Sequence, residues 1–113
     1  MKIAIPTHDG ITVAPVFRHA RGFLICTIEF GEITHEEIRW NLLSEILTAE
    51  DGFFYNLKDC SLVIANSISD YAVRKLLGDD KKVIISEETV ITNALLHYRD
   101  QEMVVESNLT CCP

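Results

Sequence analysis

The chain has 113 residues, of which 48% are hydrophobic and 24% charged, as expected for one folded domain with a buried core. Its net charge of -7 disfavours nucleic acid as a partner, because affinity for phosphate backbones comes mainly from clustered Lys and Arg. The sequence shows no signal-peptide core and no apolar window of about 20 residues, so we expect a cytoplasmic protein without a membrane partner.

The first half of the chain predicts a three-stranded, antiparallel meander. Pro6 is expected to end the first strand because it cannot donate to a strand ladder. Asp9-Gly10 marks a turn, and residues 13–22 have no clean period and are predicted to form a loop. The second strand is β-branched and aromatic, and the third is rich in charge, typical of an outer hairpin strand. The three strands are predicted at residues 1–5, 23–30 and 33–42.

The second half predicts helices that alternate with short apolar strands. Ser69 is a good N-cap and Gly78 a good stop for the middle helix. Both strands are predicted to be buried on both faces and parallel, because helical crossovers join them. The helices are predicted at 48–57, 71–77 and 89–99, and the strands at 61–65 and 82–86. The fold class is therefore α/β, with a mixed sheet of about five strands and helices on its faces.

Two segments carry the candidate binding residues: a basic cluster, and a loop that follows a parallel strand, where α/β sheets bind ligands. Arg18 and His19 belong to a basic cluster that could bind an anionic metal cluster, with His19 as a ligand; a solvated basic loop is the alternative. Asn66 and Ser67 precede a helix N-terminus, which can hold an anion, although an ordinary capped helix has the same sequence.

The other histidines give weaker signals. His8 could be a metal ligand oriented by the neighbouring Asp9, and a plain polar turn is the alternative. His35 and His97 fall on a predicted strand and helix, and we interpret both as structural.

Four cysteines are expected to be reduced thiols, since no signal peptide indicates an oxidising compartment. Cys111 and Cys112 could bind a thiophilic metal or an Fe–S species, or belong to a frayed tail. Cys26 lies in an apolar strand and is predicted to be a core residue. Cys60, at a helix–strand junction, is compatible with either role.

Sequence motifs of common enzymes are missing. The chain has no Gly-x-Gly-x-x-Gly, Walker loop, nucleophile elbow or His-Glu-x-x-His motif. Residues 1–6 and 61–65 carry no carboxylates, which argues against metal-dependent nuclease chemistry. We therefore predict a protein that is not an enzyme.

Several segments together resemble a known family, the dinitrogenase iron–molybdenum cofactor biosynthesis domains of the NifX, NafY and NifB C-terminal type. The segments span roughly residues 1 to 99 and include Met1-Lys2-Ile3-Ala4-Ile5-Pro6-Thr7, Ala14-Pro15-Val16, residues 17–25 and Gly31-Glu32-Ile33. The resemblance implies a ribonuclease-H-like fold and binding of iron–molybdenum cofactor or its Fe–S precursors. It also implies cofactor-assembly proteins as partners, in nitrogen fixation. The family's Gly-rich turn is replaced by Asn66-Ser67-Ile68-Ser69.

Our first hypothesis is a non-enzymatic accessory or carrier protein that binds iron–molybdenum cofactor or a related anionic metal–sulfur cluster. Its predicted domain is residues 1–100, followed by a polar tail at 101–113. The alternative is a diverged, metal-free interaction or regulatory module that uses the hairpin face of residues 32–39. The predicted cofactor-binding residues are Arg18, His19, Asn66 and Ser67, and the predicted metal ligands are His19, Cys111 and Cys112.

Overall fold

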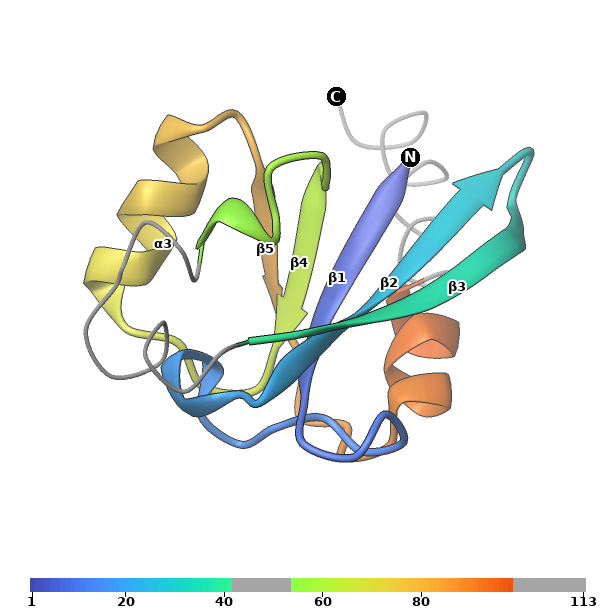
Figure 1. The fold of residues 1–113 in the computed structure, drawn as a ribbon, viewed down its shortest axis with the longest axis horizontal. Coiled ribbons are helices and arrows are strands. Elements are labelled where there is room, and N and C mark those ends of the chain that lie inside the picture. Colours follow the sequence, from blue (N-terminus) through green and yellow to red (C-terminus); the bar gives the residue numbers. More distant parts are fainter. Residues whose placement is uncertain (42–53, 99–113) are drawn as a thin grey trace, which may run out of the picture.

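Five strands form one mixed sheet in the computed structural model, which describes residues 1–41 and 54–98 (Figure 1). Across the sheet the strand order is β3-β2-β1-β4-β5. Neighbouring strands are antiparallel in β1–β2 and β2–β3, and parallel in β1–β4 and β4–β5. The strands are β1 (Lys2–Thr7), β2 (Gly22–Glu29), β3 (Glu32–Trp40), β4 (Leu62–Ala65) and β5 (Lys82–Ile85). The predicted α/β class, meander and parallel half are confirmed. The ribonuclease-H-like label and the domain limits stay predictions.

Helices cover both faces of this sheet. The α-helix α3 (Asp70–Gly78) begins at its predicted cap, where Ser69 Oγ accepts a hydrogen bond from the Ala72 N–H (3.2 Å). A second helix, over residues 91–98, lies on the opposite side of the sheet (Figure 1). The predicted cap at Thr48 lies outside the described residues. No helix within the described ranges has the length and apolar character needed to cross a membrane.

Alternation along the central strands divides the core into two layers, because successive side chains of a strand point to opposite faces. In β1, Ala4 packs with the layer under α3, whereas Ile3 and Ile5 pack with the layer under residues 91–98. The strand β4 alternates in the same way. The α3 layer contains Phe17, Phe23, Phe54, Leu57, Ala72 and Leu76. Burial on both faces therefore fixes β1 and β4 at the centre of the sheet.

Two strand predictions are wrong in detail. The strand β1 continues through Pro6 to Thr7. Pro6 O accepts a hydrogen bond from the Ala14 N–H (2.8 Å), so this residue's backbone faces away from β2, and β4 pairs only with Ile3 and Ala4. The missing N–H of Pro6 therefore costs no ladder bond. The strand β5 was predicted to be buried on both faces but is an edge strand, with Ile85 58% exposed.

The predicted loop at residues 13–22 contains a short 3₁₀ helix, η1 (Phe17–His19). Phe17 is fully buried and packs against Phe23 and Phe54, with ring centroids 5.7 and 6.1 Å away. One aromatic anchor thus attaches this loop to the core under α3. Arg18 is half-buried and His19 is exposed on the same turn.

Candidate functional site

The carboxyl ends of β1 and β4 carry the two loops that the sequence singled out, and main-chain contacts join these loops. The Phe17 N–H donates to Ser67 O (2.9 Å), and Val16 and Ser67 form an isolated parallel bridge. Arg18 and His19 therefore lie beside Asn66 and Ser67 at one edge of the sheet. The structure brings these four residues together; their role in binding stays a prediction.

Positive charge at this edge comes from the segment of residues 18–21, which we call the cationic loop. It contains Arg18, His19 and the exposed Arg21. The N-terminus of α3 is less suited to an anion than the sequence suggested. Asp70 places a carboxylate in the first turn of α3, and the Ser69 hydroxyl already accepts a hydrogen bond from the Ala72 N–H. The cationic loop is therefore the better candidate for attracting an anion.

Asn66 braces the edge of the sheet. With its amide oriented to satisfy the surrounding carbonyls, Asn66 Nδ2 donates to Ser86 O (2.6 Å) and Glu88 O (2.9 Å). Both N–H donors of the side chain are engaged in this way. In this orientation the amide oxygen also faces donor groups, so the side chain is held in place by its surroundings.

His8 and Asp9 form hydrogen bonds with different partners, and no bond between their side chains is seen. The Asp9 carboxylate accepts hydrogen bonds from the Thr12 N–H (2.8 Å) and the Ile11 N–H (2.9 Å), and these bonds lower the pKa of Asp9 to about 2. His8 Nδ1 instead accepts a bond from the Arg21 N–H (3.3 Å), which places the proton of the neutral ring on Nε2. The turn is held by Asp9, and His8 supports the cationic loop.

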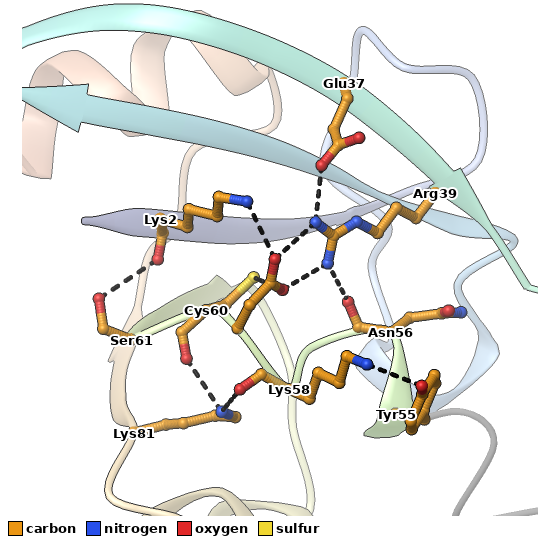
Figure 2. Close-up of polar contacts among 10 residues, drawn as sticks. Lys2, Glu37, Arg39, Tyr55, Asn56, Lys58, Cys60, Ser61 and Lys81 are labelled. Carbon is orange, nitrogen blue, oxygen red and sulfur yellow. Dashed lines mark hydrogen bonds and ion pairs between the residues drawn. The ribbon is translucent and has the colours of Figure 1, made fainter.

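The contact between His8 and Arg21 was missed in the sequence. The two residues are 13 positions apart in the sequence, and no local pattern connects them. A second group that was missed is the polar network around Arg39, in which Nη1 and Nη2 donate to the Asp59 carboxylate at 2.5 and 2.8 Å (Figure 2). These hydrogen bonds raise the pKa of Arg39 and lower that of Asp59. Glu37 and Lys2 complete the ion pairs.

Cys26 and Cys60 are both buried core residues. Cys26 is 0% exposed and Cys60 is 3% exposed. Burial raises the pKa of each thiol to about 11. The core role predicted for Cys26 is confirmed, and Cys60 has the same environment. The predicted ligands Cys111 and Cys112 lie outside the described residues. Within residues 1–41 and 54–98, no group of three or more His, Cys, Asp or Glu side chains is placed to hold a metal ion.

These thiols are expected to resist modification in the folded protein. At pH 8 a pKa of about 11 leaves roughly one thiol in a thousand as the reactive thiolate, and burial blocks access to it. A Cys111→Ser/Cys112→Ser variant should therefore give almost no reaction with an aromatic disulfide reagent until denaturant is added, when two thiols react. Rapid release of one equivalent of the reagent's aromatic thiolate by the native variant would contradict the burial of Cys26 or Cys60.

Comparisons with known proteins agree with this architecture. The family model for dinitrogenase iron-molybdenum cofactor matches residues 1–101. The crystal structure of PH0822 superposes with a TM-score of 0.77 at 19% identity, covering 89% of this chain and 90% of that one. A crystal structure from Methanocaldococcus jannaschii, provisionally named a dinitrogenase, gives 0.73 at 19% identity and covers 90% of each chain.

A solution structure of a Thermotoga protein, provisionally named NifB, gives a TM-score of 0.70 at 21% identity, covering 88% of this chain and 87% of that one. At these identities the structural likeness shows a shared fold. The comparison with curated proteins finds no match. The family model, in contrast, spans nearly the whole sequence, including β1, the cationic loop and β4. The chain therefore belongs to the dinitrogenase iron-molybdenum cofactor family.

Proposed function

We propose that this protein is a non-enzymatic accessory or carrier that binds iron–molybdenum cofactor, or a related anionic metal–sulfur cluster, at the edge formed by the cationic loop and Asn66-Ser67. The family supports a role connected with this cofactor. The observation that carries the proposal is the main-chain bond from Phe17 to Ser67, which places Arg18 and His19 beside the end of β4. Cofactor-assembly proteins in a reducing cytoplasm are the partners that fit this role.

The chemistry of the proposed site follows from charge and ligand type. Guanidinium groups attract an anionic cluster and can bond to its sulfur or carboxylate acceptors. The exposed imidazole of His19 supplies a nitrogen ligand for iron. Cys111 and Cys112 are proposed as additional thiolate ligands from the tail, and Ser67 as an exposed hydroxyl at the edge. We assign no catalytic residue.

Replacing His19 by Ala is expected to weaken uptake of isolated iron–molybdenum cofactor on the order of 100-fold, because the bond to iron is lost; even supporting residues of metal sites typically contribute 10–100-fold. Uptake is measured anaerobically by the visible absorbance of the cluster after gel filtration. A [4Fe–4S] cluster assembled from iron and sulfide serves as a second probe. A Cys111→Ser/Cys112→Ser variant, measured in the same uptake experiment, tests the two proposed thiolate ligands.

The matched control is His35→Ala, which removes an exposed histidine from β3, away from the cationic loop. It should take up both probes as the wild type does. Equal uptake by His19→Ala and the wild type would remove His19 from the site. If the wild-type chain bound neither probe, the metal-free alternative would stand. The edge strand β3 favours that alternative, since Ile33, Ile38 and Trp40 are 45%, 40% and 54% exposed.

A further inference from the structure

The main chain of the cationic loop is hydrogen-bonded to Asn41, the residue that follows β3. Asn41 Nδ2 donates to Ala20 O (3.0 Å), and the Asn41 N–H donates to Arg21 O (2.7 Å). Two consecutive carbonyls of the loop are therefore bound by one residue. Together with the bond from the Arg21 N–H to His8, these contacts determine how the loop presents Arg18 and His19.

Asn41 is itself oriented by a chain of hydrogen bonds that leads away from the site. Asn41 Oδ1 accepts from Asn56 Nδ2 (2.6 Å), and Asn56 O accepts from Arg39 Nη1 (2.8 Å). Arg39 is in turn paired with Asp59, and Figure 2 shows Arg39 bonded to Glu37 and Asn56. The charge of Arg39 is compensated by Asp59 and Glu37, so this guanidinium is a poor candidate for binding an anion. Its role is to orient Asn56 through the bond to Asn56 O.

The chemistry at position 41 requires a group that donates and accepts at once. The side chain faces a carbonyl oxygen on the loop and an amide N–H of Asn56, and a carboxamide supplies both partners. An Asp in its place would direct a carboxylate oxygen at the Ala20 carbonyl and repel it. An Ala would leave Ala20 O and the Asn56 amide without this partner.

We propose that Asn41 is a positioning residue for the metal–sulfur cluster site: through Ala20 and Arg21 it holds the cationic loop in the geometry that binds the cluster. This inference rests on the proposed function and assigns Asn41 no contact with the cluster. Supporting residues of this kind orient the groups that bind, and their loss reduces affinity while leaving the ligands in place.

The test compares Asn41→Ala, Asn41→Asp and Asn41→Gln with the wild type, all at a temperature where each variant is fully folded. Isolated iron–molybdenum cofactor is the probe, and its visible absorbance and circular dichroism report both the affinity and the geometry of the bound cluster. Asn41→Ala and Asn41→Asp are expected to raise the dissociation constant about tenfold and to change the dichroism of the bound cluster. Asn41→Gln keeps both hydrogen-bonding groups and should recover part of the affinity.

The control for general destabilisation is Ile3→Val, which shortens a buried side chain in the opposite core layer. It should lower the unfolding midpoint and leave the dissociation constant unchanged. Equal weakening by Ile3→Val and Asn41→Ala would overturn the inference, as would wild-type affinity of Asn41→Ala beside a loss in His19→Ala. If His19→Ala and Asn41→Ala both bound as the wild type does, the proposed site would fail together with the inference.

Discussion

Phe17→Ala is expected to lower the free energy of unfolding by about 3–5 kcal/mol, the usual cost of truncating a fully buried phenylalanine. Phe17 is 0% exposed and contacts the rings of Phe23 and Phe54, so the substitution leaves a cavity between the loop and the core under α3. Alanine keeps the main-chain N–H that donates to Ser67 O, so the expected loss of stability comes from the missing ring and not from this bond. Chemical denaturation measures the loss of stability.

The matched control for this substitution is Phe30→Ala. Phe30 lies at the hairpin tip between β2 and β3 and is completely exposed. Because it buries no surface, its truncation should change the free energy of unfolding by less than about 0.5 kcal/mol. A loss below about 1 kcal/mol in Phe17→Ala would contradict its role as the anchor of the cationic loop, since mutations of that size occur at ordinary positions.

Gly22→Ala is expected to cost about 2–3 kcal/mol, the upper part of the range for overpacking. Gly22 is the residue of β2 that pairs with Trp40 of β3 and Thr7 of β1. A Cβ atom there would lie 2.6 Å from Trp40 Cε3 and 2.7 Å from the main-chain oxygen of Arg39. The indole can move aside, but the carbonyl belongs to the β2–β3 ladder and cannot move without breaking it. Thermal unfolding, followed by the single tryptophan, measures the effect.

Gly78→Ala is the control for this second substitution. A Cβ atom at Gly78, the last residue of α3, would meet no atom within 4 Å. Alanine also restricts the unfolded chain more than glycine does, so this variant should be as stable as the wild type or slightly more stable. If Gly22→Ala unfolded at the same temperature as Gly78→Ala, the close approach of β3 to β2 at Trp40 would be wrong.

Local patterns in the sequence determined most of the secondary structure. The β-branched run after Gly22 predicted β2, and Ser69 predicted the start of α3 because an N-cap acts on neighbouring residues. The predicted stop at Gly78 is one residue early, since Gly78 is the last residue of α3 and Asp79 is its C-cap. Short apolar runs also predicted where the parallel strands lie along the sequence, as β4 shows. The rule that ligands bind at the carboxyl ends of such strands selected Asn66 and Ser67. The basic cluster selected Arg18 and His19 by residue type, and the structure places these four residues together.

Strand order and long-range hydrogen bonds were decided only by the tertiary structure. The apolar run of β5 reads like that of β4, and the two differ because one lies at the edge of the sheet and the other between β1 and β5. The bonds from Asn41 to Ala20 and from Asn56 to Asn41 join residues 21 and 15 positions apart. The sequence by itself determined which segments are apolar and where positive charge gathers, since both depend on residue type and spacing. Only the folded chain determined which polar side chains support the cationic loop, because the contacts of Arg39 and Asn41 with Asn56 form only when β3 and residues 54–60 are brought together.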